Sequence, residues 1–521
     1  MKLAILHTSD THGFITPTSY QDKSNYSAPF SLSRVSTLIA QQREKYGEKN
    51  VLVTDSGDSL QGSPLASYLE SLSQDEGLKK LSDAYNIINY DARVVGNHDF
   101  NFGFNYLKNF IVNDHATFLN DNVLNQNTDA PAFGQKSIII EKAGIKIGIV
   151  GVTTQYISKW EPIENIPNLK FVSAYEGLKS EVKKIRPKVD ILVALYHGGF
   201  ESDLATGKPT EPHNGENEGY KIFEKIPEID VFLTGHQHRR LNLVKNNMAI
   251  VQPGHKGETV AEVIIDFEKD SSGNVKINNL QTQLLEAKEA APDKKIMTLM
   301  KGLDKKTQEW LDKPIATLSQ AAPIKNAIEG RLKGAPFINL IHQMQLFFTK
   351  ADLSATAIMA EDAGGFSKNV TMREILLNYP FANQLAVVKV SGADIRKIIE
   401  HSLSFLDKDK NGEVKFEENV LKPKNMLFNF DLFYPVHYEA DINKPVGQRL
   451  TKLTLYGEQI KDDHLYRLAV NNYRALGGGF YPGYSMDKIE KIYDQDYVQL
   501  FEKYLNQVNV DVDSKKNYSF Y

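Results

Sequence analysis

The sequence predicts an α/β fold followed by a mixed α+β half, in a chain of at least two domains. At 521 residues the chain is too long for one hydrophobic core. Over the first 270 residues, short apolar runs alternate with longer helical patterns, which is typical of sheets covered by helices. Later strands and helices follow no repeat. We expect one domain over residues 1–285, a linker helix within 286–315, and a second domain over 316–521.

The elements of the first half follow from hydrophobic periodicity. The expected strands are Leu3–Leu6, Val51–Thr54, Ala92–Val95, Ile145–Val152, Ile191–Tyr196, Val231–Thr234, Ala249–Val251 and Val260–Phe267. The expected helices are Leu32–Tyr46, Ser63–Tyr85, Glu176–Ile185 and Gly219–Ile226. The polar stretch Ser19–Ser33 has no periodicity and predicts a loop near the end of the first strand.

A helical pattern over Ala290–Glu309 is interpreted as a bridge between the two domains. The second half then predicts, in order, a strand at Pro314–Ser319, a helix at Pro336–Phe348, a strand at Leu385–Ser391, a helix at Ala393–Leu406, a loop-rich stretch Asp407–Asp431, strands at Leu450–Leu455 and Leu465–Asn471, and a helix at Asp496–Gln507. Asp407–Glu418 reads DKDKNGEVKFEE, which resembles an EF-hand calcium loop, but a solvated charged loop is the preferred interpretation.

Composition excludes several classes of protein. The net charge is −4, without a long basic run, which argues against a nucleic-acid duplex or an anionic membrane as partner. The chain has no cysteine, so any metal site must use His, Asp, Glu or Asn. Met1 and Lys2 precede only four apolar residues, Leu3–Leu6, which predicts a strand and not a signal peptide. We expect a cytoplasmic enzyme, while noting that a chain whose leader had been removed would look the same.

Polar residues gather where the expected strands of the first half end. They are Asp10 and His12, Asp55 and Asp58, Asn97 and His98, His197, and His236 and His238. Ligands of open α/β sheets bind beyond the carboxyl ends of the strands, so these side chains are expected to converge on one crevice. A buried structural histidine explains any one of them as well. Five of the thirteen histidines follow expected strands, and a buried structural role does not explain all five together.

A set of histidines and carboxylates without thiolates suits two divalent cations such as Mn, Zn, Fe or Co. Asp10 and His12 are alternate residues of an extended segment, so both can reach one ion. His236 and His238 can do the same or serve two ions. A single carboxylate, Asp58, could bridge cations about 3.5–4 Å apart, and Asn97 offers a neutral carbonyl oxygen.

These motifs resemble the five ordered blocks of the calcineurin-like metallophosphoesterases: Asp10-x-His12, Gly57-Asp58, Gly96-Asn97-His98-Asp99, His197 and Gly235-His236-x-His238. The resemblance implies a four-layer α/β/β/α domain that binds two metals. It implies that one metal is held by Asp10, His12, Asp58 and His238, and the other by Asp58, Asn97, His197 and His236.

The same resemblance implies that His98 is catalytic and not a ligand. It would face the substrate and either stabilise the transition state or protonate the leaving oxygen, with Asp99 orienting its ring. A hydroxide held by the cations would be the nucleophile.

The second half resembles the C-terminal domain of 5′-nucleotidases. The matching stretches are Tyr379-Pro380-Phe381-Ala382-Asn383-Gln384-Leu385, Lys389-Val390-Ser391-Gly392, and Asn471-Asn472-Tyr473-Arg474-Ala475-Leu476-Gly477-Gly478-Gly479. In that family this α+β domain holds the nucleoside between two aromatic rings. Tyr473 matches one ring, and Phe428 is preferred over Phe381 for the other. Arg474 and Asn429 complete the implied substrate-binding set. Gly477–Gly479 could let the backbone approach a ligand closely.

Departures from the 5′-nucleotidase pattern narrow the prediction. Glu361–Ser367 lacks the arginine usual in that branch, and Gly479 stands where it tends to carry aspartate. Asn101 also replaces an aspartate that can pair with the catalytic histidine. Asn101, the Asn471–Gly478 block, the Phe428–Asp431 block and the Gly57–Leu65 block resemble instead the 2′,3′-cyclic-nucleotide 2′-phosphodiesterase/3′-nucleotidase branch, which we therefore expect.

The alternatives are a 5′-nucleotidase or UDP-sugar hydrolase with the same machinery, a non-catalytic nucleotide sensor, and a metal-dependent nuclease. A sensor would be expected to have lost a ligand or His98, and a nuclease to carry basic surface charge. The resemblance also implies that the second domain can rotate, with a hinge in Ala290–Glu309. The oligomeric state does not follow from the sequence.

Overall fold

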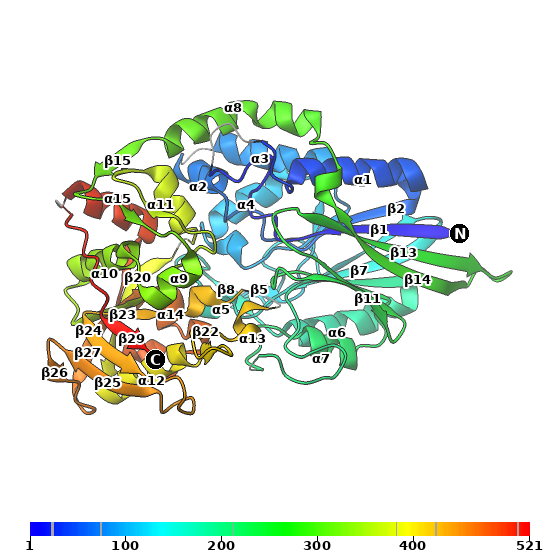
Figure 1. Cartoon of the computed structure of the whole chain (residues 1–521). Helices are drawn as coiled ribbons and strands as arrows, with labels where there is room; N and C mark the ends of the chain where they lie inside the picture. The colour runs from blue at the N-terminus through cyan, green and yellow to red at the C-terminus, as the bar shows by residue number, and fades with distance from the viewer. Residues whose placement is uncertain (22–25, 73–74, 212, 382, 423–424, 508–509) are drawn as a thin grey trace. The chain divides into compact units, whose positions relative to one another are not determined.

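A computed structural model describes residues 1–21, 26–72, 75–211, 213–381, 383–422, 425–507 and 510–521. The chain divides into two units, Met1–Thr307 and Gln308–Tyr521. The division falls within α8 (Lys294–Leu311), the long green helix of Figure 1. This helix is the one expected at Ala290–Glu309, and it starts and ends slightly later. No helix of the described ranges is both long enough and apolar enough to span a membrane.

The first unit alternates strands and helices as predicted. Its strands are β1 (Lys2–Thr8), β2 (Val51–Asp55), β3 (Ala92–Arg93), β4 (Thr117–Phe118), β5 (Val123–Asn125), β6 (Ser137–Lys142), β7 (Ile145–Thr153), β8 (Leu169–Phe171), β9 (Ile191–His197), β10 (Val231–Thr234), β11 (Arg240–Lys245), β12 (Met248–Pro253), β13 (Thr259–Lys269) and β14 (Val275–Glu286). Its helices before α8 are α1 (Leu32–Tyr46), α2 (Pro64–Ser71), α3 (Asp75–Ile88), α4 (Phe104–Asn113), α5 (Ile157–Trp160), α6 (Ala174–Ile185) and α7 (Gly219–Lys225).

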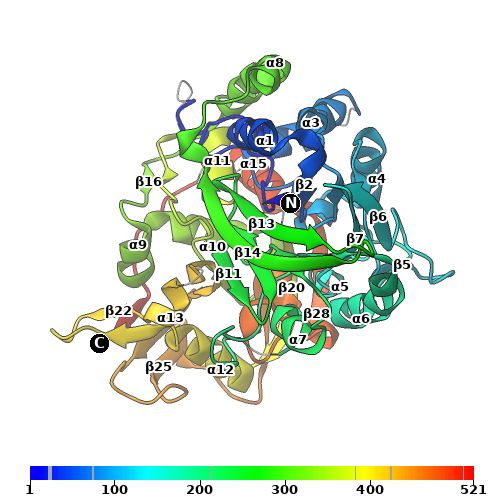
Figure 2. The same ribbon diagram turned by 90° about the vertical axis from the view of Figure 1, so that its right-hand side faces the viewer.

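Two six-stranded sheets form the centre of this unit, in the orders β14-β13-β1-β2-β3-β4 and β11-β12-β10-β9-β7-β6. One apolar core, including Ile5, Leu52, Ile147 and Val193, lies between the sheets. A second core joins the outer face of the second sheet to α6 and α7. Figure 2 shows α1 and α3 on one side of the sheets and α6 and α7 on the other. The four-layer α/β/β/α prediction is confirmed.

Parallel pairing brings the carboxyl ends of several strands of this unit to the same edge. β1 pairs in parallel with β2, and β7, β9, β10 and β12 are parallel neighbours in the other sheet. Their carboxyl ends therefore lie at the same edge of each sheet, and each is followed by polar residues. The strands on which the site depends are almost fully buried.

Some boundaries differ from the predictions. The strand expected at Ala92–Val95 ends at Arg93. After Arg93 the backbone packs closely against Gly57, where a Cβ would lie 2.5 Å from the carbonyl carbon of Val95. The single helix expected over Ser63–Tyr85 is instead α2 and α3, and residues 73–74 lie outside the described ranges. β14 was not predicted, because its alternating, half-exposed side chains carry no apolar run.

The second unit is α+β, as expected. Its strands are β15 (Pro314–Thr317), β16 (Ala322–Pro323), β17 (Leu353–Thr356), β18 (Gly365–Phe366), β19 (Asn369–Thr371), β20 (Gln384–Ser391), β21 (Leu406–Lys408), β22 (Val414–Phe416), β23 (Leu432–Tyr434), β24 (Val436–Ala440), β25 (Leu450–Leu455), β26 (Glu458–Gln459), β27 (Leu465–Asn471), β28 (Ile489–Asp496) and β29 (Tyr518–Phe520). Its helices are α9 (Ala327–Lys333), α10 (Pro336–Thr349), α11 (Met372–Asn378), α12 (Gly392–Leu403), α13 (Glu418–Leu421), α14 (Asn472–Ala475) and α15 (Tyr497–Gln507).

The largest sheet of this unit has the order β23-β17-β27-β20-β28, and a four-stranded sheet has the order β26-β25-β24-β29. The segment compared with a calcium loop forms the antiparallel hairpin of β21 and β22. Asp407 lies in a strand and pairs with Lys415 at 3.4 Å, and the Asp409 carboxylate accepts from the backbone N–H of Asn411 and Glu413. These carboxylates are thus occupied within the hairpin, which differs from the helix-flanked calcium loop.

Candidate active site

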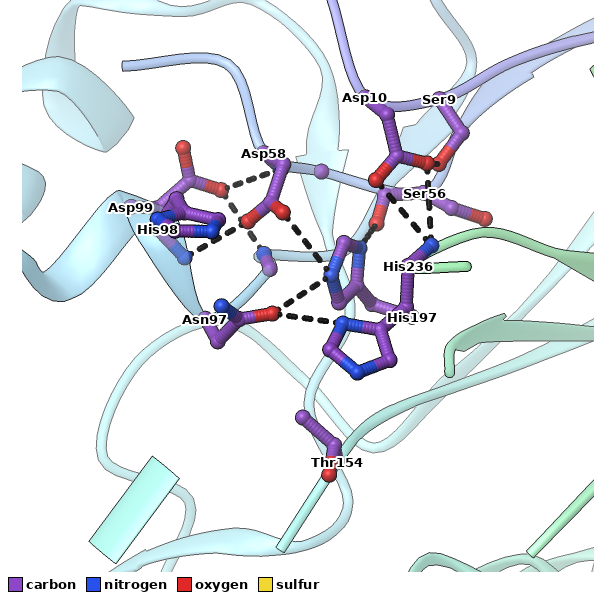
Figure 3. A network of polar contacts seen from close by, with 12 residues as sticks. Ser9, Asp10, Ser56, Asp58, Asn97, His98, Asp99, Thr154, His197 and His236 are labelled. Carbon is purple, nitrogen blue, oxygen red and sulfur yellow. Dashed lines mark hydrogen bonds and ion pairs between the residues drawn. The ribbon is translucent and has the colours of Figure 1, made fainter. Parts of the chain in front are cut away.

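The polar residues that follow the strands of the first unit converge on one site, as the sequence predicts. Asp10 follows β1, Asp58 follows β2, His197 ends β9 and His236 follows β10. Figure 3 shows these four side chains turned toward one another, with Asn97 beside the two histidines. The side chains of Asp10, Asp58 and His197 are almost completely buried. Two sheets thus contribute to a single polar cluster.

Asp10, His12 and His238 form one group of potential metal ligands. Nε2 of His12 lies 3.0 Å from Nε2 of His238, which in turn lies 3.4 Å from Oδ1 of Asp10. Nδ1 of His12 lies 2.7 Å from the carbonyl oxygen of Gln61 and must donate to it, so Nε2 of the neutral ring carries a lone pair. Burial lowers the pKa of His12 to about 3, which keeps this ring neutral.

Asp58, His197 and His236 form the second group. Oδ1 of Asn97 lies 3.1 Å from Nε2 of His197 and 2.9 Å from Nδ1 of His236. Nδ1 of His197 lies 2.7 Å from the carbonyl oxygen of Ser56 and donates to it, which turns Nε2 toward the cluster. The sequence prediction placed Asn97 with these same residues.

Asp58 stands between the two groups. Its Oδ1 accepts from the backbone N–H of His98, 2.7 Å away. Its Oδ2 is buried, accepts no hydrogen bond among the described residues, and lies 3.3 Å from Nε2 of His197 and 3.9 Å from Nε2 of His12. A buried carboxylate oxygen facing imidazole nitrogens of both groups is suited to bridge two cations. The donor set, oxygen and nitrogen without sulfur, fits divalent metals.

The backbone of the cluster is unusual. Five of the predicted ligands have positive φ: Asp10 (54°), His12 (51°), Asp58 (56°), His236 (70°) and His238 (55°). Such values are uncommon outside glycine and concentrate at functional sites. Neighbouring glycines allow close approach: a Cβ at Gly96 would lie 2.1 Å from Oδ1 of Asp58, and one at Gly235 would lie 2.1 Å from Oγ of Ser9. The glycines of the motifs are therefore required by the packing of the ligand loops.

The expected role of Asp99 is wrong. Its carboxylate does not orient His98; it accepts from the backbone N–H groups of Gly96, Asp58, Ser59 and Leu60 at 2.7–3.0 Å. Burial and the nearby Asp58 raise the pKa of Asp99 to about 6. Asp99 thus ties the loop after β2 to the loop after β3. The residue that contacts the His98 ring is Asn101, whose Oδ1 lies 2.8 Å from Nδ1 of His98.

Two residues near the candidate ligands escaped the sequence interpretation. The Glu216 carboxylate lies 3.2 Å from Nε2 of His236, on the side of the ring opposite Asn97. The ring of His255 stacks on that of His238, with centroids 4.8 Å apart and an interplanar angle of 4°. His255 comes two residues after β12, so the same strand-end signal could have found it. Glu216 lies in a polar loop without a comparable signal.

The predicted aromatic residues of the second unit are half-buried. The rings of Phe381 and Phe428 lie 6.2 Å apart with a tilt of 48°. A Cβ at Gly478 would lie about 2.5 Å from the ring of Tyr473. The glycine at this position therefore allows the backbone to pack against the Tyr473 ring, whereas the sequence suggested a close approach to a ligand. Ala382 of the Tyr379–Leu385 motif lies outside the described residues. The structure thus brings Phe381 and Phe428 together and leaves Tyr473 partly accessible.

Arg474 and Asn429 are not placed for direct substrate contact, contrary to expectation. The Arg474 side chain is 1% exposed and binds both oxygens of Asp431, at 2.8 and 2.9 Å. Its Nη1 also donates to Oδ1 of Asn429 and to the carbonyl oxygen of Gly478. A buried guanidinium must be paired in this way, because an unpaired charge would be costly there. The two residues hold together the loops that present Phe428 and Tyr473.

Comparison with known proteins agrees with this geometry. The sequence model of the calcineurin-like phosphoesterases matches residues 3–240. The model of the 5′-nucleotidase C-terminal domain matches residues 314–485. Each match falls within one of the two structural units.

Relatives and solved structures extend the comparison. A 2′,3′-cyclic-nucleotide 2′-phosphodiesterase/3′-nucleotidase of Haemophilus influenzae is 26% identical over 99% of this chain and 87% of its own length. The trifunctional nucleotide phosphoesterase YfkN of Bacillus subtilis is 24% identical over 94% of this chain, which spans only 36% of that protein. A crystal structure of a putative 5′-nucleotidase from Staphylococcus aureus is 34% identical, covers both chains completely and superposes with a TM-score of 0.91.

Fold, site and comparisons together define a metal-dependent phosphoester hydrolase. The four-layer unit supplies two groups of potential metal ligands, and the second unit is of the type found in nucleotidases. The chain belongs to the calcineurin-like phosphoesterase family, in the group that carries a 5′-nucleotidase C-terminal domain.

Proposed function

We propose that this protein is a 2′,3′-cyclic-nucleotide 2′-phosphodiesterase/3′-nucleotidase. The observation that carries the proposal is the 2.8 Å contact of His98 with Asn101, at a position where the 5′-nucleotidase branch commonly has aspartate. A relative of that name aligns over 99% of the chain. The absence of arginine from Glu361–Ser367 supports the same choice.

We propose that Asp10, His12, Asp58 and His238 hold one divalent cation, and that Asp58, Asn97, His197 and His236 hold the other. When bound, the cations supply a water molecule of lowered pKa and positive charge for the phosphoryl oxygens. The chain supplies the geometry. Backbone donors fix Asp58 and Asp10: His98 N–H binds Asp58 Oδ1, and His236 N–H lies 3.0 Å from Asp10 Oδ2.

His98 acts on the substrate in this proposal. Its ring is partly exposed and meets the ring of His12 edge to face, with centroids 5.3 Å apart. Its Nδ1 is engaged by Asn101, which leaves Nε2 for the phosphoryl group or the leaving oxygen. A histidine so placed can donate a hydrogen bond to developing negative charge or a proton to the departing hydroxyl.

The second unit, residues 316–521 in the domain division proposed from the sequence, binds the nucleoside. Tyr473 stacks on one face of the base, and Phe428, supported by Phe381, stacks on the other. Such stacking stabilises a base by roughly 1–3 kcal/mol whatever its hydrogen-bonding edge. The buried Arg474–Asp431 pair keeps both loops in place.

A substrate panel tests the proposal. The purified protein with added Mn²⁺ is assayed for phosphate release or ring opening on 2′,3′-cyclic AMP, 3′-AMP, 5′-AMP and UDP-glucose. We expect kcat/KM for 2′,3′-cyclic AMP and 3′-AMP to exceed that for 5′-AMP at least about tenfold. If 5′-AMP is hydrolysed much faster than both, the proposal is wrong.

The second candidate is a 5′-nucleotidase. The structure that supports it is the putative 5′-nucleotidase of Staphylococcus aureus, 34% identical over the whole chain. The same panel separates the two, since a 5′-nucleotidase prefers 5′-AMP and a UDP-sugar hydrolase UDP-glucose. Absence of turnover on all four substrates, with tight binding of one of them, would indicate a nucleotide sensor.

A further inference from the structure

A chain of hydrogen bonds runs from the His98 ring through Asn101 to Glu161 and Asn165. Neither Glu161 nor Asn165 was among the site residues predicted from the sequence. Nδ1 of His98 meets Oδ1 of Asn101 at 2.8 Å, and Nδ2 of Asn101 donates to Oε1 of Glu161 at 2.5 Å. The other carboxylate oxygen of Glu161 accepts from Nδ2 of Asn165 at 3.0 Å. Among the described residues, no lysine or arginine forms an ion pair with Glu161.

The carboxylate decides which way the Asn101 amide points. An ionised carboxylate can only accept hydrogen bonds, so the NH₂ group of Asn101 must face Glu161. Its carbonyl oxygen must then face His98, and Nδ1 of His98 must carry a proton to donate to it. The Nδ1–H bond is the same whether the ring is neutral or charged. Nε2 can therefore gain or lose a proton without any rotation of the ring.

Asn165 makes this arrangement rigid. Its Nδ2 donates both to Oε2 of Glu161 and to the backbone carbonyl oxygen of Asn101, each at 3.0 Å. Its backbone carbonyl oxygen accepts from the N–H of Phe104, at the start of α4. The amide of Asn165 is thus fixed from two sides, whereas the amide of Asn101 depends on Glu161 alone for its orientation.

We propose that Glu161 is a positioning residue that acts through Asn101 to hold His98 in the Nδ1–H tautomer. The turnover tests of this proposal rest on the function proposed above. The measurement of the His98 tautomer does not. Glu161 and His98 are 63 residues apart in the sequence, and the carboxylate lies one amide away from the histidine. The chain thereby keeps a negative charge near His98 without placing it against the ring.

The first test replaces Glu161 by glutamine, which keeps the shape. The introduced side chain has one acceptor oxygen for two amide donors, so one donor must turn away. Since Asn165 is held by a second acceptor, Asn101 turns, presents NH₂ to Nδ1 of His98, and favours the Nε2–H tautomer. We expect Glu161→Gln to lower kcat about tenfold with KM changed less than about twofold. Glu164→Gln, which removes an exposed charge from the same loop, is the matched control and leaves both constants unchanged.

A direct readout of the tautomer comes from nitrogen-15 NMR of histidine-labelled, zinc-loaded protein at pH 8. Burial raises the pKa of Glu161 to about 6, so the carboxylate is ionised at this pH. The His98 signals are assigned by their loss in His98→Gln. We expect the ring proton on Nδ1 in the wild type and Glu164→Gln, and on Nε2 in a large fraction of Glu161→Gln.

Asn101→Asp and Glu161→Gln should each lower kcat, and combining them should restore part of it. Asn101→Asp places a carboxylate against Oε1 of Glu161, and the two negative charges force one to take up a proton. In Asn101→Asp/Glu161→Gln, the introduced glutamine accepts from Asn165 and donates to the introduced aspartate, which in turn accepts from His98. We expect the double variant to exceed both single variants in kcat at least about threefold.

The proposal is overturned if Glu161→Gln and Glu164→Gln behave alike in kcat and in the His98 signals. It is also overturned if the double variant is no better than the single ones. Turnover is measured on whichever substrate of the panel the wild type hydrolyses. If the wild type hydrolyses none, the proposed function fails, and the position of the His98 proton still decides the role of Glu161.

Discussion

The backbone N–H of His98 donates to Oδ1 of Asp58 over 2.7 Å. The residue proposed to act on the substrate therefore positions a proposed metal ligand with its backbone, while its ring points elsewhere. The other oxygen of Asp58 remains directed at the imidazole nitrogens of His197 and His12. The two functions of the Gly96–Asp99 turn can thus be separated by mutation.

Replacing His98 by alanine removes the ring and keeps the backbone donor. We expect His98→Ala to retain the wild-type metal content and to lower kcat by about 10²–10⁴-fold. Asp58→Ala removes the carboxylate proposed to bridge the two cations and should lose metal as well as activity. Metal analysis of the dialysed proteins checks both. Loss of metal from His98→Ala would contradict the roles assigned here.

Gly96 tests how closely the ligand loops must pack. A Cβ at this position would lie 2.1 Å from Oδ1 of Asp58, so Gly96→Ala must displace the carboxylate. We expect kcat to fall at least about 100-fold and the affinity for Mn²⁺, measured by calorimetry, to fall with it.

Gly302→Ala, within α8, is the control for Gly96, because among the described residues no atom outside the adjoining turns of the helix lies within 4 Å of the added Cβ. It should raise the free energy of unfolding by about 0.5–1 kcal/mol and leave turnover unchanged. Equal turnover of Gly96→Ala and Gly302→Ala would mean that catalysis does not require the Asp58 carboxylate in its present position.

Asp304 should make stability depend on pH. It lies in α8, is 2% exposed, and accepts a hydrogen bond from Thr16 at 3.1 Å. Burial raises its pKa to about 7, above the value of about 4 in the unfolded chain. Between about pH 4 and pH 7 the folded state keeps a proton on Asp304 that the unfolded state releases. The contribution of Asp304 to the free energy of unfolding is therefore full below about pH 4 and is lost as the pH rises to about 7.

Asp304→Asn keeps an acceptor for Thr16 and cannot ionise. Relative to wild type, its free energy of unfolding should rise by at least about 1 kcal/mol between pH 5 and pH 8. Urea titrations at the two pH values measure this difference. A constant difference between the two proteins would show that Asp304 is not the titrating group.

The Arg474–Asp431 pair should contribute to stability and not to substrate contact. Both residues are at most 2% exposed, so Arg474→Leu leaves a buried carboxylate unpaired. We expect a loss of about 3–5 kcal/mol in the free energy of unfolding, with partial recovery in Arg474→Leu/Asp431→Leu. Unchanged stability with a raised KM would instead favour substrate contact by Arg474.

Much of the candidate site could be predicted because its polar residues follow buried strands. Apolar runs locate the ends of β1, β2, β9 and β10, and parallel pairing brings those ends together. The family resemblance adds which residue belongs to which group. The fold class was predicted for the same reason, since layers of helix and sheet follow from hydrophobic periodicity.

What escaped prediction depends on contacts between distant loops. Glu161 follows a short helix in a stretch without periodicity, and only the folded chain shows that it reaches Asn101. Asp99 was expected to orient the His98 ring, whereas in the folded chain its carboxylate faces four backbone donors. Arg474 looked like a ligand-binding residue until its burial against Asp431 was known.

The positive φ angles at Asp10, His12, Asp58, His236 and His238 restrict how this site can evolve. Aspartate, asparagine, histidine and glycine tolerate such backbone better than other residues. A descendant that no longer hydrolysed anything would still find isoleucine or valine at these positions costly. Asparagine and glycine would be the accessible replacements, so the marks of a lost activity would be small, conservative substitutions.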